Sequence, residues 1–144
     1  MEIEQIVLVV KQTDYEQLIL RHASITQAAF VLERRGDNLE KYATAHRTYQ
    51  TALGKIRAQF PKQIPVDVID QNRITLYPWR SRQLIVVCGP DGLFVNLAKL
   101  ITAQPVIAVN PDPAHVSGKI MIHAPDSVGK LIDAVLQGTA EIAR

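Results

Sequence analysis

The sequence predicts an α/β fold, a doubly wound, parallel-sheet, three-layer domain. Four short runs rich in β-branched residues, at 6–10, 66–69, 84–88 and 105–109, are typical of buried strands. Between them lie segments whose apolar residues recur every three or four positions, as in amphipathic helices. Strands that alternate with such helices favour a parallel sheet covered on both faces. We expect residues 1–144 to form a single domain.

Composition excludes several classes of protein. The formal net charge of +2 is too small to indicate a nucleic-acid partner. No apolar run approaches the ~18 residues of a membrane span, and the acidic start, Met1 to Glu4, is unlike a secretory signal. The single Cys88 rules out an internal disulfide and ends a predicted strand, where a buried thiol is expected. These observations favour a cytoplasmic protein without nucleic-acid or membrane partners.

Capping signals place the helices of the first half. Each has Ser, Thr or Asp three residues before Glu or Gln, the pattern of a capping box. The pairs are Thr13 or Asp14 with Glu16 or Gln17, Ser24 with Gln27, and Asp37 with Glu40. The second helix should bury Ala28, Val31 and Leu32, and Gly36 should end it.

The longest predicted helix, residues 39–60, carries a heptad-like seam that Pro61 ends. The seam consists of Leu39, Tyr42, His46, Tyr49, Leu53, Ile56 and Phe60. It could pack on another helix of the same domain, or on a second copy of the chain in a homo-oligomer. His46 lies inside the seam, so we expect a partly buried histidine rather than a ligand.

The second half follows the same alternation. Residues 70–83 should be irregular, with Pro78 and Trp79 as surface anchors. The helix after residue 92 should bury Phe94, Leu97, Ala98 and Ile101. Gly118 should precede a short strand at 119–123. Asp126 should cap a last helix with a core face of Val128, Leu131, Ile132, Val135 and Leu136.

Two polar turns follow neighbouring predicted strands, Gly89-Pro90-Asp91-Gly92 and Asn110-Pro111-Asp112-Pro113. Carboxyl ends of parallel strands share one edge of a sheet, which is where ligands bind in such folds. This edge is the candidate site. Pro-Asp-Gly is also a common turn tripeptide, so a purely structural Asp91 is the alternative, and Asp112 is expected to be a turn residue. Two nearby histidines, His115 and His123, lack the carboxylates that would complete a metal site.

The run from Gly89 to Phe94, the helix after it and the Pro105-Val-Ile-Ala-Val-Asn110 run resemble the amino-terminal domain of NAD kinases. That family has Gly-Gly-Asp-Gly-Thr after a buried strand, then a helix and a strand of the type Pro-Val-Leu-Gly-Ile-Asn. The resemblance implies ATP-dependent phosphoryl transfer to NAD, giving NADP, with Mg²⁺ held mainly by nucleotide phosphates. It also implies that Asp91 activates the ribose hydroxyl, that Gly89 and Gly92 let the backbone approach phosphates, and that Asn110 lines the nucleotide site.

The chain departs from the family pattern in three respects. Pro90 replaces a glycine and removes an N–H, and Leu93 replaces a threonine and removes a hydroxyl. The β-rich second domain of NAD kinases is expected to lie outside these residues, so the chain is either a fragment or a short relative. Two hypotheses follow: a weakened NAD kinase-type domain, or a non-catalytic nucleotide-binding, regulatory or assembly domain.

Overall fold

The structure is a computed structural model that describes residues 2–22 and 24–139. It divides into two compact units, each described by itself below. The sheet unit consists of Met1–Lys11 and Ala52–Arg144, and the helical unit is Gln12–Thr51. The chain therefore leaves the sheet unit after its first strand and returns within a long helix, α3 (Leu39–Ala58).

The sheet unit is built on four parallel strands, which confirms the predicted α/β fold class. They are β1 (Gln5–Val10), β2 (Val66–Asp70), β3 (Gln83–Cys88) and β4 (Val106–Val109). Their order across the sheet is β2-β1-β3-β4, and every neighbouring pair is parallel. All four coincide with the apolar runs that predicted them, within one residue at each end.

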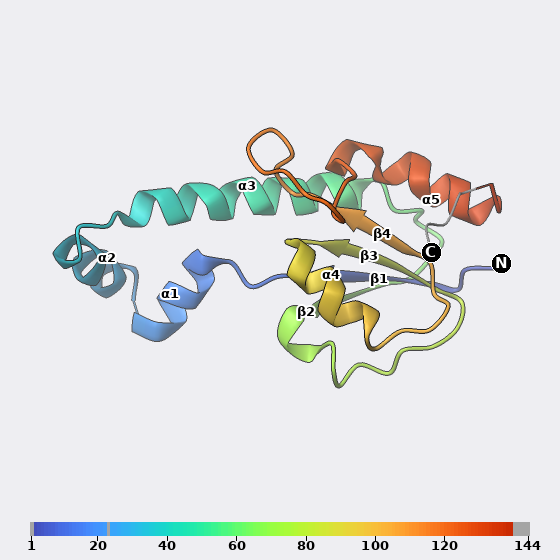
Figure 1. Ribbon diagram of the computed structural model, residues 1–144, viewed down its shortest axis with the longest axis horizontal. Helices are drawn as coiled ribbons and strands as arrows, with labels where there is room; N and C mark the ends of the chain where they lie inside the picture. The colour runs from blue at the N-terminus through green and yellow to red at the C-terminus, as the bar shows by residue number, and fades with distance from the viewer. Residues whose placement is uncertain (1, 23, 140–144) are drawn as a thin grey trace. The chain divides into compact units, whose positions relative to one another are not determined.

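Helices cover both faces of this sheet (Figure 1). On one face, α4 (Asp91–Ala98) packs Leu93 and Leu97 against a core that includes Val7, Ile85 and Val87. The other face lies beneath α5 (Val128–Leu136) and the last turns of α3. Because side chains alternate along a strand, that face receives the residues between those of the first core. Its fully buried strand residues include Ile6, Leu8, Leu84 and Val86.

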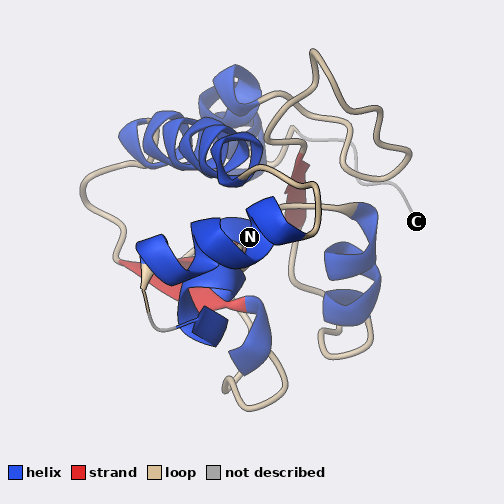
Figure 2. Ribbon diagram, turned by 90° about the vertical axis from the view of Figure 1, so that its left-hand side faces the viewer, coloured by secondary structure: helices blue, strands red, loops and turns tan. Residues whose placement is uncertain are grey.

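Two short 3₁₀ turns and long loops complete the sheet unit. They are η1 (Gln71–Arg73) and η2 (Pro125–Ser127). Trp79 is half-buried rather than a surface residue, since it packs on the core and its indole N–H donates to the Ile74 carbonyl at 2.9 Å. Figure 2, coloured by secondary structure, shows the loops in tan, and residues 110–122 belong to them.

The helical unit contains α1 (Asp14–His22), α2 (Ile25–Arg34) and the first turns of α3. Two predicted caps are confirmed. Thr13 and Glu16 form a reciprocal capping box, and the Ser24 hydroxyl accepts from the Gln27 N–H at 3.1 Å. Gly36 follows α2 with a φ of +73°, a left-handed conformation that glycine adopts without strain.

The third predicted cap is wrong in one residue. The Asn38 side chain, not that of Asp37, accepts from the Glu40 N–H at the start of α3. Asp37 instead pairs with Lys41 at 2.9 Å and accepts from the Tyr42 hydroxyl at 2.7 Å. An asparagine one position later can reach the same helix end, and local spacing alone does not choose between the two.

The seam of α3 is buried only in part. Tyr49 and Ile56 are buried, whereas the seam residues on either side of them are half-buried. Phe60 lies beyond the end of the helix at Ala58. The chain therefore covers the seam only in part, and oligomerisation through it remains a prediction.

Three predictions for the second half are corrected. The segment 119–123 is not a strand, because only His123 makes an isolated bridge, to Val109. Asp126 does not cap α5, because it lies within η2, and the N-cap residue of α5 is Ser127. Ala98 is exposed; α4 buries Leu97, as predicted, together with Leu93, which was not predicted.

Candidate functional site

The two polar turns meet at the carboxyl edge of the sheet, as their sequence positions predicted. Cys88 and Val109 are partners in the register of β3 and β4, so the turns that follow them start side by side. The Gly89 N–H donates to the Val109 carbonyl at 3.3 Å. Asn110 is the first residue of the connection that leads from β4 to α5.

This edge also contains the point where the strand order reverses. The chain passes from β1 to β2 on one side of the sheet and then to β3 on the other. Ligands of open α/β sheets bind outside the carboxyl ends of the strands at such a switch point. Lys11 directly follows β1 there, and a Cβ on Gly89 would lie 3.7 Å from the Cβ of Lys11.

The two glycines of the first turn have different surroundings. Gly89 is buried, and a Cβ there would lie 3.0 Å from Leu93 Cδ2, so a larger residue would require the Leu93 side chain to shift. Gly92 is exposed, and a Cβ there would meet nothing within 4 Å. Gly92 therefore leaves open space over the first turn of α4, whereas the absence of a side chain at Gly89 lets Leu93 pack closely against the backbone. Pro90 lies exposed between them at the capping position of α4.

Asp91, the first residue of α4, is bound to the chain's own backbone. Its Oδ2 accepts from the Lys119 N–H at 3.2 Å, and its Oδ1 accepts from Ile120 at 3.3 Å and Met121 at 3.1 Å. Hydrogen bonds from backbone N–H groups, first Met121 and then Lys119, hold the pKa of Asp91 below its usual value. In this conformation the carboxylate fixes the loop that leads to α5.

Asn110 is buried and organises the same connection from its other end. Its amide nitrogen donates to the Val116 carbonyl at 2.7 Å, and its side-chain oxygen accepts from the Asp112 N–H at 2.9 Å. Asp112 lies in a turn, as expected, and its carboxylate contacts His115 Nδ1 at 2.9 Å. The Asn110 backbone N–H donates to the His123 carbonyl at 2.8 Å.

The sequence did not reveal the partners of these residues. The N–H donors at 119–121 lie in a segment whose alternation resembles a strand, and backbone donors carry no residue signature. Lys11 was not selected from the sequence, although its position could have indicated it. A lysine directly after the first strand of a parallel sheet lies at the same edge as the two turns.

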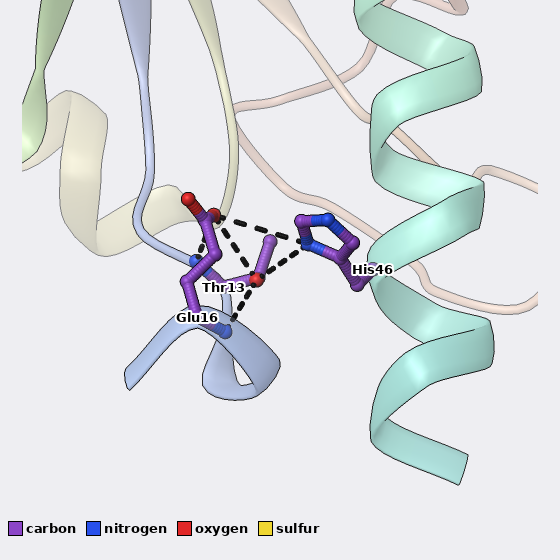
Figure 3. A network of polar contacts seen from close by, with 3 residues as sticks. All are labelled: Thr13, Glu16 and His46. Atoms are coloured by element: carbon purple, nitrogen blue, oxygen red, sulfur yellow. Dashed lines mark hydrogen bonds and ion pairs between the residues drawn. The ribbon is translucent and has the colours of Figure 1, made fainter. Parts of the chain in front are cut away.

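A second polar cluster lies in the helical unit (Figure 3). The Thr13 hydroxyl is 2.8 Å from His46 Nδ1 and 3.1 Å from Glu16 Oε1. The Glu16 carboxylate lies 3.9 Å from the same ring nitrogen, and the Tyr15 ring lies 5.0 Å from the imidazole. Both polar partners thus approach one nitrogen of the ring, and the cluster ties the start of α1 to α3. His46 is a half-buried packing residue, as expected.

The described residues contain few other features that point to a particular chemistry. Within residues 2–22 and 24–139 there is no group of three or more His, Cys, Asp or Glu side chains that could hold a metal ion. No helix in the described part of the chain has the length and apolar character needed to cross a membrane. Neither a protein-family model nor a curated protein matches the sequence.

Proposed function

We propose that the carboxyl edge of the sheet unit binds a nucleotide in the manner of an NAD kinase-type domain, transferring phosphate from ATP to NAD. The observation that carries the proposal is the convergence of two motifs. The Gly-Pro-Asp-Gly turn and the Asn-Pro-Asp-Pro turn stand on adjacent parallel strands, next to the switch point of the sheet.

Each residue would have a distinct role in that reaction. Asp91 would orient and activate the ribose hydroxyl that receives the phosphoryl group, since this transfer depends mainly on positioning and charge stabilisation. Gly92 would let phosphates approach the backbone at the start of α4, and the space around its Cα supports that role. Gly89 would keep the turn tight against Leu93, and Asn110 would shape the neighbouring wall.

Magnesium, which the resemblance implies, would be held by the phosphates of the nucleotide. The described residues offer no group of three acidic, histidine or cysteine side chains near one another, and Mg²⁺ commonly keeps its waters and binds through substrate phosphates. When bound, the ion would neutralise charge on the phosphates during transfer. The residues of the turn would position the nucleotide.

Specific observations favour the alternative, a nucleotide-binding domain without phosphoryl transfer. Three backbone N–H groups occupy the carboxylate of Asp91, so it is not poised to accept a proton. Leu93, at the threonine position of the family, is only 5% exposed and belongs to the core. The occupied Asp91 carboxylate and the apolar Leu93 should each reduce the rate of phosphoryl transfer more than the affinity for nucleotide. The rate depends on contacts made in the transition state, and affinity does not.

Calorimetric titration with ATP and with NAD, beside a coupled assay for NADP, tests the proposal. Binding of either nucleotide by the wild-type chain, or by a variant whose site is held open, supports the proposal, and failure of both chains to bind either nucleotide contradicts it. Asp91→Asn should abolish any NADP formation in a kinase, and Pro90→Gly should raise it by restoring the missing N–H. In the non-catalytic alternative neither variant changes a background rate. Pro90 suits this test because it is exposed, whereas Leu93→Thr would also perturb the core.

A further inference from the structure

One carboxylate holds a loop in place over the start of α4. We call residues 116–122, within the connection from β4 to α5, the strap. The N–H groups of Lys119, Ile120 and Met121 all donate to Asp91, whose two oxygens are both used. The residue that the proposed function needs for its substrate is therefore the residue that closes the strap.

The remainder of the strap is held by few side chains. Val116 and Ile122 are 56% and 65% exposed, and Ile120 is 37% exposed. Met121 is the exception, since it is 1% exposed and belongs to the core beneath α4. The strap contains neither helix nor strand. Segments with few buried side chains open at a smaller free-energy cost than the global unfolding of the molecule.

We propose that the strap is an autoinhibitory cover, and that a ligand with a vicinal diol, such as the ribose of a nucleotide, opens it by taking over the Asp91 carboxylate. This inference rests on the proposed nucleotide site. The two hydroxyls of a diol donate to a carboxylate as backbone N–H groups do, so the ligand and the strap compete for the same acceptor oxygens. Binding then releases residues 119–121 from their hydrogen bonds.

Such competition has two measurable consequences. Amides 119–121 should exchange with deuterium faster when nucleotide is bound, although a ligand ordinarily slows exchange at its site. The apparent affinity should also rise in any variant whose strap is already open, because affinity is reduced by the fraction of molecules in the closed state.

Gly118 offers a variant that opens the strap without touching Asp91. A Cβ at Gly118 would lie 2.5 Å from the Met121 carbonyl oxygen, so Gly118→Ala must displace this end of the strap. The matched control is Gly54→Ala in α3, where a Cβ would meet nothing within 4 Å. If Gly118→Ala does not fold, the exchange measurement on the wild-type chain still decides the question.

The test combines hydrogen–deuterium exchange of wild type with and without saturating ATP or NAD and calorimetry of both variants. We expect exchange at amides 119–121 to become roughly tenfold faster with nucleotide. Gly118→Ala should bind roughly three- to tenfold more tightly than wild type, and Gly54→Ala should bind like wild type. Binding by Gly118→Ala alone also supports the strap.

Two other outcomes overturn the inference. Nucleotide binding with unchanged or slower exchange at 119–121 contradicts the strap and leaves the proposed function standing. Absence of binding by wild type and by Gly118→Ala contradicts both.

Discussion

Replacing Gln59 by alanine should detach the start of α5 from the end of α3. The Gln59 side chain joins three backbone groups: its nitrogen donates to the Lys55 carbonyl at 2.8 Å and the Pro125 carbonyl at 2.7 Å, and its oxygen accepts from the Gly129 N–H at 2.7 Å. The last two contacts span 66 and 70 residues of sequence. They hold η2 and the first turn of α5 in the sheet unit.

The expected loss follows from those two long-range bonds. A neutral hydrogen bond contributes roughly 0.5–1.5 kcal/mol net, so Gln59→Ala should lower the free energy of unfolding by about 1–3 kcal/mol. For a chain of this size that corresponds to a fall in Tm of about 4 °C per kcal/mol. Gln59→Glu should cost at least as much, because its carboxylate would face the Lys55 and Pro125 carbonyl oxygens, to which the amide donates.

Urea unfolding followed by tryptophan fluorescence is the direct assay. Trp79 is the only tryptophan, and it packs on the core of the sheet unit, so its emission reports that unit. Gln63→Ala is the control, since Gln63 is exposed and such changes usually stay within about 0.5 kcal/mol. The reasoning is refuted if Gln59→Ala and Gln63→Ala unfold at the same urea concentration.

Two further predictions concern the strap and the helical unit. Met121→Ala should lower stability by about 2–5 kcal/mol in the same assay, whereas Ile122→Ala, at an exposed position, should cost under about 0.5 kcal/mol; equal costs would show that the strap does not anchor in the core. Lys41, then Tyr42 and the Asn38 N–H, lower the pKa of Asp37 from 3.8 to about 2. The contribution of Asp37 to stability should therefore be fully present above about pH 4 and be lost as the pH falls through about 2. NMR titration of the Asp37 carboxyl checks this, and a titration midpoint near 3.8 would contradict the contacts.

The sequence predicted the sheet well because its signals are local. The four β-branched runs became the four strands, and parallel pairing necessarily placed the two polar turns on one edge. Two helix caps were also predicted correctly, one as a full capping box and one as a single cap hydrogen bond, since each depends on residues three apart.

The strap shows why the rest was not predicted. Alternation at 119–123 is real, because Met121 is buried while Ile120 and Ile122 are exposed. The segment nonetheless forms no strand, since the N–H groups of 119–121 donate to Asp91 and are not available for a ladder. That acceptor is 28 to 30 residues away in sequence, and no local pattern announces it.

The start of α5 illustrates the same limit. A local signal favoured Asp126 as its cap, but Asp126 is exposed, and Gln59 accepts from the Gly129 N–H instead. A cap supplied from another element depends on the fold being formed. Asp91 likewise has hydrogen-bond partners that are distant in sequence. The Pro-Asp-Gly turn was evident in the sequence, whereas the partners of its carboxylate were not.

The most direct test of the account is an NMR titration of the ¹⁵N-labelled chain with NAD and with ATP in the presence of Mg²⁺. Chemical shifts should change chiefly at the carboxyl edge of the sheet, at residues 89–93 and 110–121. Residues 80–83, next to the start of β3 at the opposite edge, serve as the internal reference. Changes centred on 80–83, or none at saturating nucleotide, would contradict it.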